Sequence, residues 1–490
     1  MILATVIVGT FLGRLDQTVV NLAIPKIIDG FGITVSAASW IATAYIIANA
    51  VFVPVWGKLG DTIGRKKIYI LGFTIFIVGS VLAALAWNLG SLLLFRVVQA
   101  IAASADYPTA MAILAVTFRE PKERAQALGI WSSAFASSAV FGPLIGGPLI
   151  DIFGWRSVFM INLPVGLIGL YMAMTYIKES VSEKKTFKFD WWGSIFLGGA
   201  LAALVLVLDQ GVDWGWTDPR SLIAYAVAII CSVVFYIVER RHPEPVVDFS
   251  FFKNRTFNAA IINNLIVFLG MMGSIFAIPI FAQTFLGYNA TQAGALFIPM
   301  GLAIPFSAAL LGRFLLSRVS ARTVVFWSTL GAAFSFYFLS WIDARSSAWD
   351  LMWPLMLMAL FMGAGMAQRT ALIVQSVPQS EIGVASSILA LVRNVGGAFG
   401  IAIFATLTNI LTKKNVLNIA QNSILHLTTQ AQYQTAVVLI ELKAEILAYS
   451  QVYIVAAVVV AIGAFSIFVM KKGSKEDVEM SHEHAAMAEA

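Results

Sequence analysis

Blocks of roughly twenty apolar residues, separated by short polar turns, repeat along the whole chain. Because a helix rises about 1.5 Å per residue, each block is long enough to cross the roughly 30 Å hydrocarbon core of a bilayer. The pattern predicts about fourteen membrane-spanning helices. We expect these spans at residues 3–25, 38–57, 67–87, 91–118, 125–150, 156–178, 190–209, 219–238, 256–285, 291–316, 322–342, 351–375, 383–411 and 446–470.

The spacing of charged stretches divides these spans into groups. Spans seven and eight are set apart by the polar segments 182–190 and 239–255, which leaves six spans on each side. We therefore expect an all-α membrane protein of two six-helix bundles with an inserted two-helix hairpin. The predicted domains are the N-terminal bundle 1–180, the hairpin with its cytoplasmic linkers 181–250, the C-terminal bundle 251–472 and the cytoplasmic tail 473–490. The tail composition is typical of disorder.

Segment 412–445 of the C-terminal bundle is too polar to span and too long for a simple turn. We place it outside the cell. Its apolar spacing allows short interfacial helices or a lid, and a packed external cap is the alternative.

Composition and charge agree with a membrane location. The chain is 59% hydrophobic and 12% charged, whereas soluble proteins devote about a quarter of their residues to charge. This balance excludes water-soluble folds and nucleic-acid binders. Roughly two-thirds of the 32 lysines and arginines fall in the loops on the side of the N-terminus, so the positive-inside rule makes both termini cytoplasmic. The apolar start is interpreted as span one with a short or missing lead-in, since it lacks a basic n-region and a cleavage site.

Ionisable residues inside the predicted spans are the strongest candidates for chemistry, because charge in a bilayer is costly. Asp16 lies in span one, and span four holds Arg96, Gln99 and Asp106. Gln99 and Asp106 fall within about 20° of each other on a helical wheel and Arg96 within about 80°, so this face looks into the bundle. We interpret Asp16 and Asp106 as proton-coupling groups that exchange protons as water access alternates, with Arg96 as a counter-ion. Permanently paired structural acids are the alternative.

Substrate contacts are expected from both bundles. In the first bundle the candidates are Asp106, Gln99 and Tyr107, and the Asp106 carboxylate would attract a cation. In the second bundle Asn263 and Asn264 of span nine are placed to line the cavity.

Three arginines receive other interpretations. Arg369 and Arg393 lie near the cytoplasmic ends of spans twelve and thirteen, where we expect gate or loop contacts. Arg14 lies about 200° around its helix from Asp16 and has no assigned role.

Two glycine-rich segments have candidate conformational roles. Residues 57–67 follow span two and form a charged loop, interpreted as a gate that holds one side of the protein shut; a simple basic loop that sets topology is the alternative. Small residues with a proline on span five predict a tight, kinked helix contact, with either packing or gating as its role. The gate candidates are Gly57, Asp61, Gly64, Arg65 and Lys66, and the span-five set is Gly142, Pro143, Gly146 and Gly147.

Other chemistry is disfavoured by what the sequence lacks. There is no G-x₄-G-K-[ST] nucleotide loop, and all four histidines lie outside the predicted spans. Neither ATP-driven transport nor histidine-based metal catalysis is expected, so we predict no enzyme activity, cofactor or metal site. The lone Cys231 has no partner for an intramolecular disulfide.

These segments together resemble the major facilitator superfamily, and in particular its fourteen-helix drug:H⁺ antiporter branch, which includes quaternary-ammonium and quinolone exporters of Gram-positive bacteria. Residues 57–67 resemble the loop signature G-x-L-x-D-x-x-G-R-[RK]-[RK], and residues 142–147 resemble the antiporter signature G-P-x-x-G-G. Residues 15–25 resemble the span-one signature, whose acid matches Asp16, and residues 96–99 resemble the span-four signature implicated in proton transfer. Asp106 departs from the pattern, which has an aliphatic residue there, as do Arg14 and the alanines at 100, 102 and 103.

The resemblance implies a major facilitator fold in a bacterial cell membrane. We expect a proton-coupled exporter, a drug:H⁺ antiporter of lipophilic, cationic compounds, that works by alternating access. Its partners would be the lipid bilayer, a small-molecule substrate and protons, with no nucleic acid, and the protein would be a monomer. The alternatives are an exporter of an endogenous metabolite, peptide or lipid on the same fold, and a non-transporting membrane receptor or scaffold.

Overall fold

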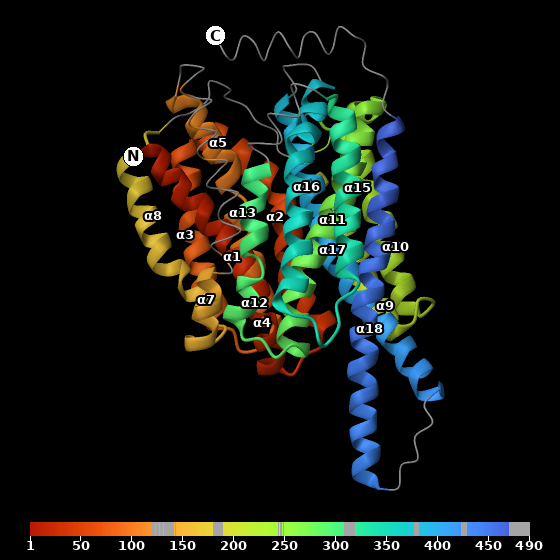
Figure 1. Ribbon diagram of the computed structural model, residues 1–490. Helices are drawn as coiled ribbons and strands as arrows, with labels where there is room; N and C mark the ends of the chain where they lie inside the picture. Colours follow the sequence, from red (N-terminus) through yellow and green to blue (C-terminus); the bar gives the residue numbers. More distant parts are fainter. Residues whose placement is uncertain are drawn as a thin grey trace.

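The computed structural model describes residues 1–118, 123, 127, 131, 142, 144–179, 190–243, 245, 247, 249–307, 319–376, 382–422 and 429–469. Within these residues the secondary structure is helical (Figure 1). The first helices are α1 (Ile2–Phe31), α2 (Val35–Ile63), α3 (Arg65–Ala84), α4 (Leu89–Ala103), α5 (Asp106–Thr117), α7 (Ser157–Met160), α8 (Asn162–Tyr176), α9 (Trp191–Trp214) and α10 (Pro219–Arg241). The later ones are η1 (Phe249–Lys253), α11 (Arg255–Phe285), α12 (Ala290–Ala295), α13 (Ile298–Phe306), α15 (Ala321–Leu339), α16 (Ala348–Gln375), α17 (Ile382–Asn422), α18 (Gln430–Phe465) and η4 (Ser466–Val469).

Length and hydropathy identify a multi-pass membrane protein. Among the described residues, 11 segments are long and apolar enough to cross a membrane. Two shorter apolar helices, Leu144–Phe153 and Ala290–Ile304, lie between them in the sequence. Large side chains such as Ile229, Tyr171 and Phe334 are exposed on the outside of the bundle, as expected for a surface that faces lipid rather than water.

Proline positions explain why three spans are divided into two helices. A proline lacks the N–H that the helix needs, and its ring clashes with the carbonyl four residues earlier. Helix α4 ends at Ala103, α7 at Met160 and α12 at Ala295; Pro108, Pro164 and Pro299 follow these ends by four or five residues. The first two breaks come directly before Asp106 and Asn162, so prolines set the backbone at two polar residues.

The helices form two groups that lie side by side (Figure 1). Helices α1 to α8 pack mainly on one another, and so do α11 to α18, with α1 against α11 and α2 against α17 between the groups. We call these groups the first and the second half. Helix α9 packs on α10 and on both α2 and α17, and the Thr406 hydroxyl of α17 donates a hydrogen bond to the Leu208 carbonyl of α9 at 2.7 Å.

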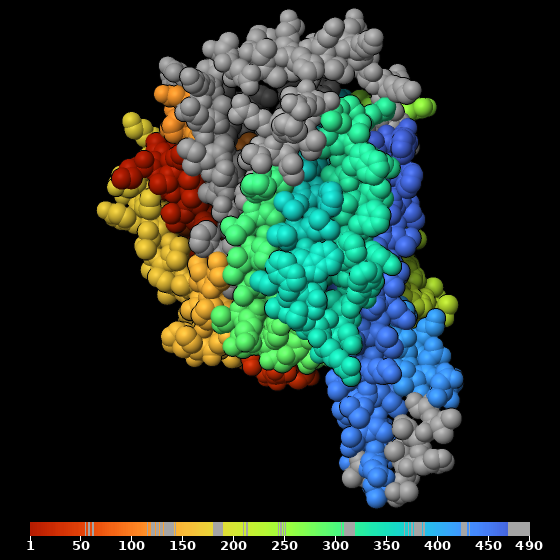
Figure 2. Space-filling model, viewed as in Figure 1, coloured from red at the N-terminus to blue at the C-terminus, as the bar shows by residue number. Residues whose placement is uncertain are grey.

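Segment 412–445 differs from the expected lid or packed cap. Helices α17 and α18 continue beyond the rest of the bundle, at the end opposite to the start of α1 (Figures 1 and 2). Side chains along these two helices, such as Leu417, Tyr433 and Leu439, are exposed. The physical reason is the absence of any glycine or proline from 412 to 445: polar residues end a membrane span but do not end a helix. The Asn415 amide ties the pair together by donating to the Ala444 carbonyl at 3.2 Å.

Several expectations concern residues outside the described ranges. They include Pro143, most of the predicted span at 125–150 and the tail at 473–490. The side chain of Asp61 also lies outside the described part of the chain.

Candidate functional site

The first half contains a fully buried polar cluster centred on Asp16. The Asp16 carboxylate accepts a hydrogen bond from Arg96 Nη1 at 2.5 Å, which is also an ion pair, and from Gln99 Nε2 at 2.9 Å. It further accepts from Asn162 Nδ2 at 2.7 Å. Ser80 accepts from the Gln99 and Asn162 amides at 2.7 and 3.2 Å and completes the cluster. These five side chains come from α1, α3, α4 and the start of α8, so the cluster joins four helices.

Aromatic rings close the cluster on the arginine side. The Arg96 guanidinium lies 4.1 Å from the centroid of the Tyr45 ring and 5.6 Å from that of Phe159. Planar stacking on an aromatic face suits arginine better than lysine. Asp16 and Arg96 are each 1% exposed, so water does not reach the pair in this conformation. The expected proton exchange at Asp16 therefore requires a rearrangement that separates the pair.

Asp106 occupies different surroundings from Asp16, although both acids were expected on polar faces of the bundle. It begins α5 and accepts a hydrogen bond from the Thr10 hydroxyl of α1 at 2.8 Å. Thr10 in turn accepts from the Trp131 indole at 2.9 Å. Asp106 is half-buried and, together with Tyr69, lines a small cavity between α1, α3 and α4. Arg96 is paired with Asp16 and forms no ion pair with Asp106.

The other expected substrate contacts are dispersed. Gln99 is held in the Asp16 cluster, and Asn263 is fully buried in the second half, so neither lines an open cavity. Tyr107 is 38% exposed, and its ring lies 5.3 Å from that of Trp131. Asn264 is fully buried, and neither end of its side chain has a hydrogen-bond partner among the described residues.

A second buried cluster surrounds Arg369 on α16. Its Nε donates to Asn263 Oδ1 at 2.8 Å, and Nη2 donates to the Thr329 hydroxyl at 3.1 Å. Arg369 is 1% exposed, whereas the sequence indicated a gate or loop contact near the cytoplasmic end. Arg393 on α17 donates from Nη2 to the Thr370 hydroxyl at 3.1 Å and lies over the Phe268 ring.

The segment 57–67, which the sequence analysis expected to be a loop, is helical except at Gly64, because α2 continues to Ile63 and α3 begins at Arg65. It contacts the end of span six. Gly64 has a φ of 122°, which favours glycine, and a Cβ there would lie 2.6 Å from Glu179 Oε1. The Glu179 carboxylate accepts hydrogen bonds from the backbone N–H groups of Lys66 and Lys67 at 3.1 and 3.3 Å, at the start of α3. A carboxylate at a helix N-terminus is stabilised by the helix dipole. Arg65 reaches the Ala112 carbonyl of α5 at 3.5 Å, so the loop and α5 are connected.

Glycines of span five allow close backbone approach on two sides. A Cβ at Gly142 or Gly146 would clash with the side chain of Thr18 or Val19 of α1, respectively. A Cβ at Gly147 would lie 2.5 Å from Thr291 Cα and 2.9 Å from the Ala290 carbonyl, which are backbone atoms of the second half. Span five therefore packs tightly on α1 and also on the second half, across the contact between the halves.

Asp151, four residues beyond Gly147, forms a direct polar contact between the halves. Its carboxylate accepts hydrogen bonds from the Ala290 and Thr291 backbone N–H groups at 3.0 and 2.9 Å and from the Thr291 hydroxyl at 2.5 Å. Because Ala290 and Thr291 begin α12, a carboxylate of one half caps a helix of the other. We call this contact the Asp151 latch. The sequence analysis did not single it out.

We expect the Asp151→Ala variant to open the halves at this end more often, because it removes the three hydrogen bonds that Asp151 accepts across the contact, worth about 1–2 kcal/mol in total. The opening can be measured by pulsed electron paramagnetic resonance between spin labels at Phe153 and Gln292, both exposed, in a Cys231→Ser background. We expect a larger fraction of long distances between the two labels than in the labelled protein that retains Asp151. The matched control is Glu441→Ala, which removes an exposed carboxylate elsewhere; equal distance distributions in both variants would contradict the latch.

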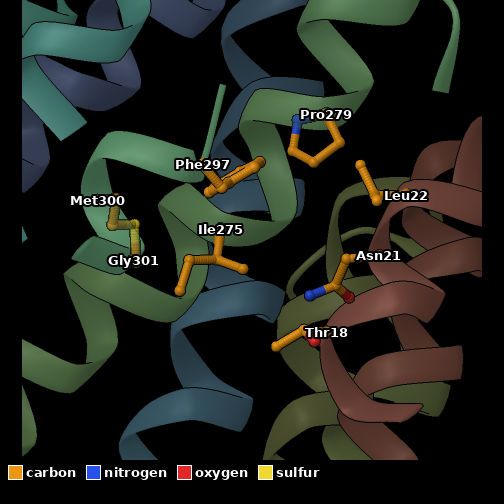
Figure 3. Close-up of a pocket in the computed structure, with 8 residues that line it drawn as sticks. All are labelled: Thr18, Asn21, Leu22, Ile275, Pro279, Phe297, Met300 and Gly301. Atoms are coloured by element: carbon orange, nitrogen blue, oxygen red, sulfur yellow. The ribbon is translucent and has the colours of Figure 1, made fainter. Parts of the chain in front are cut away.

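A small cavity lies between the halves (Figure 3). The first half contributes residues of α1, and the second half contributes residues of α11 and α13 from the opposite wall. The lining residues are Thr18, Asn21, Leu22, Ile275, Pro279, Phe297, Met300 and Gly301. Asn21 Oδ1 is buried and accepts no hydrogen bond from the described residues, so one polar acceptor is available in a largely apolar cavity.

Two helical halves that enclose a cavity beside buried charge define the architecture of secondary transporters. Comparison with known proteins makes the assignment specific. A family model described as Major Facilitator Superfamily matches residues 6–401. The chain belongs to this superfamily, as the sequence motifs indicated.

Relatives and solved structures agree with this assignment. The chain is 30% identical over 403 residues to the multidrug resistance protein Stp of Mycobacterium tuberculosis strain H37Rv, covering 81% of this chain and 74% of the relative. It is 31% identical over 413 residues to the multidrug transporter protein MdtP of Bacillus subtilis, covering 84% and 75%. A crystal structure of a POT family transporter in complex with a thioalcohol-conjugated peptide has the same fold, with a TM-score of 0.67 at 15% identity over 96% of each chain.

Proposed function

We propose that this protein is a proton-coupled antiporter that exports lipophilic, cationic compounds by alternating access. The observation that carries the proposal is the placement of α1, which contributes Asp16 to the buried cluster and Thr18 and Asn21 to the cavity between the halves. A change in the charge pairing of Asp16 would therefore act on the helix that touches the substrate. The names of the relatives, a multidrug resistance protein and a multidrug transporter, support export of drug-like compounds.

The cavity supports a lipophilic substrate with a hydrogen-bond donor. Its lining is mostly apolar, which stabilises an apolar ligand by roughly 25 cal/mol per Å² of surface removed from water. Asn21 Oδ1 offers an acceptor that an ammonium N–H group can satisfy.

Proton coupling is proposed for the two acids in different roles. Asp106 lines a cavity and is the acid that exchanges protons in this conformation. Asp16 exchanges protons only once Arg96 moves away from it. Protonation of either carboxylate removes a buried negative charge and shifts the balance between the two orientations of the halves.

Alternating access is proposed to use the contacts between the halves. The Asp151 latch closes one end together with Gln283, whose amide donates to the Leu22 carbonyl at 3.0 Å. The loop at 57–67, held by Glu179, is proposed to act at the other end. Breaking the latch while this loop holds would expose the cavity to the opposite side of the membrane.

The full topology is proposed as fourteen spans in a cell membrane. The 11 long apolar segments account for most of them. The remaining three are span five, which ends in Leu144–Phe153, span ten, which begins with Ala290–Ile304, and α15. On this proposal α9 and α10 are the inserted hairpin, both termini are cytoplasmic and the protein works as a monomer.

Reconstitution tests the proposal. In liposomes that are more acidic inside than outside, a cationic dye such as ethidium should accumulate, because exchange of one proton for one cation balances at about a tenfold dye gradient per pH unit. Accumulation should collapse when nigericin dissipates the pH gradient. Dye uptake that is independent of the gradient would contradict antiport, and the absence of uptake for a whole panel of lipophilic cations would favour an endogenous substrate or a non-transporting role.

A further inference from the structure

One nitrogen atom of Arg96 lies between two oxygen atoms of the buried cluster. Its Nη1 donates to Asp16 Oδ2 and to Gln99 Oε1, each at 2.5 Å. The other ends of the same two groups are already joined, since Gln99 Nε2 donates to Asp16 Oδ1 at 2.9 Å. The carboxylate and the amide therefore lie edge to edge, with one direct hydrogen bond between them and with Arg96 Nη1 in the place of a second.

A protonated carboxyl group fits this arrangement once Arg96 has withdrawn. A carboxylic acid and an amide are complementary, because the acid O–H donates to the amide oxygen while the amide N–H donates to the acid carbonyl. A proton on Asp16 Oδ2 would replace the guanidinium as the donor to Gln99 Oε1, and the existing bond from Nε2 to Oδ1 would be kept. The two side chains need only to close on each other until the oxygens are about 2.7 Å apart.

The other neighbours of Asp16 are less suited to accept this proton. The Ser80 hydroxyl already accepts from both amides of the cluster and donates to the Phe76 carbonyl at 2.8 Å. Asn162 presents its N–H side to the carboxylate, and its own Oδ1 is directed elsewhere, buried and without a hydrogen bond from the described residues. Because a buried O–H without an acceptor is strongly unfavourable, Gln99 Oε1 determines whether Asp16 can become neutral in this place.

The charged surroundings of Asp16 are simple in the part of the chain that the structure describes. The charge beside it is Arg96 of α4, and the titratable group behind that charge is Tyr45 of α2, whose ring stacks on the guanidinium. Helices α3, α7 and α8 contribute neutral side chains to the cluster. Arg14 and Asp106 are hydrogen-bonded to different residues of α1, and the ionisable residue of α11 is at its first position.

We propose that Gln99 is the positioning residue for the proton on Asp16: its amide forms a pair of hydrogen bonds with the protonated carboxyl group, and the proton and Arg96 compete for one place between Asp16 Oδ2 and Gln99 Oε1. The inference rests on the proposed function and deepens it, because it states what replaces the ion pair. The guanidinium keeps its charge, so each proton that binds to Asp16 Oδ2 releases Arg96 from the carboxylate.

Infrared spectroscopy of the purified protein tests the pairing. With ¹³C in the side-chain carboxyl groups of aspartate and in an Asp106→Asn background, the C=O band of protonated Asp16 is identified by its absence from Asp16→Asn. In Gln99→Met we expect the pH at which half of this band has formed to fall by about one unit, a tenfold weaker proton affinity. The protonated acid loses its acceptor, whereas the ionised carboxylate keeps Arg96 and Asn162 as donors. The band should also move to higher frequency, because hydrogen bonds polarise the C=O group.

The matched comparison is Asn162→Leu in the same background. It removes a donor to the same carboxylate oxygen, and donors favour the ionised form, so the half-point should move upward. A general disturbance of the cluster would not shift the two variants in opposite directions. Shifts of equal sign, an unchanged half-point in Gln99→Met, or a fall in Asn162→Leu alone would overturn the pairing; the last result would assign the acceptor to Asn162.

The parent protein gives a measurement that needs no Gln99 variant. A C=O band at the frequency of an acid without hydrogen bonds, or no protonated band at any pH at which the protein stays folded, would also overturn the pairing. If Asp16 shows the opposite shifts but dye accumulation in liposomes does not follow the pH gradient, the proposed function fails while the pairing stands.

Discussion

The Asp16→Asn variant is expected to lose transport and to unfold at a temperature about 3–5 °C lower than the unaltered protein. The substitution keeps the size of the side chain but removes the carboxylate that pairs with the Arg96 charge, and Arg96 is 1% exposed. Breaking a buried ion pair from one side costs about 3–5 kcal/mol. Thermal unfolding in detergent, followed by tryptophan fluorescence, measures the change.

A double-variant cycle decides whether the loss comes from the pair itself. Asp16→Asn combined with Arg96→Gln removes both charges, so the stranded cation disappears and part of the lost stability should return. Transport should remain absent, because the charge switch is gone. Additive destabilisation in the double variant would show that the ion pair does not contribute to folding, and recovery of transport would contradict a role for Asp16 in coupling.

The Asp106→Asn variant is expected to keep nearly all of its stability and to lose transport driven by a pH gradient. Asp106 is half-buried beside a cavity and forms no ion pair within the described part of the chain. An asparagine oxygen still accepts from the Thr10 hydroxyl. We therefore expect stability to change by less than about 1 kcal/mol. Dye accumulation driven by a pH gradient should fall to the level without a gradient, because the group that takes up and releases the proton is absent.

Exchange of labelled for unlabelled dye at equal pH isolates the coupling step. The Asp106→Asn variant should still catalyse this exchange, since substrate binding and reorientation do not need a net proton movement. Thr10→Val is the informative companion, because it removes the hydrogen bond to the carboxylate but leaves the acid in place. Full gradient-driven accumulation by Asp106→Asn would assign the coupling to another group.

The sequence anticipated the residues of the charged cluster better than their arrangement. Asp16, Arg96 and Gln99 were selected because polar groups on an apolar helix must face the bundle interior. The choice between Asp16 and Asp106 as the partner of Arg96 remained open, since the two acids are 90 residues apart in the chain and each would fit. The buried hydrogen-bonded ion pair between Asp16 of α1 and Arg96 of α4 decides it in favour of Asp16.

Several contributing residues were not anticipated. Asn162 and Ser80 complete the buried cluster, Glu179 caps α3, and Asp151 caps α12 of the other half. A signal for Asn162 was present, because it is an amide two residues before a proline inside an apolar run. Glu179 and Asp151 gave none, since an acid at the end of a span is usually an ordinary interfacial charge.

The amino-acid sequence by itself determined the helical membrane architecture, the superfamily and part of the buried polar cluster, namely Asp16, Arg96 and Gln99. These properties are local: hydropathy over about twenty residues, helical periodicity and short motifs record them directly. Tertiary structure alone decided that Asp16 is sealed against Arg96, that Asp106 lines a separate cavity, that Asp151 links the halves and that Arg393 bonds to Thr370. Such facts depend on distances between helices far apart in the chain, and one span's hydropathy is the same whichever neighbour it packs against.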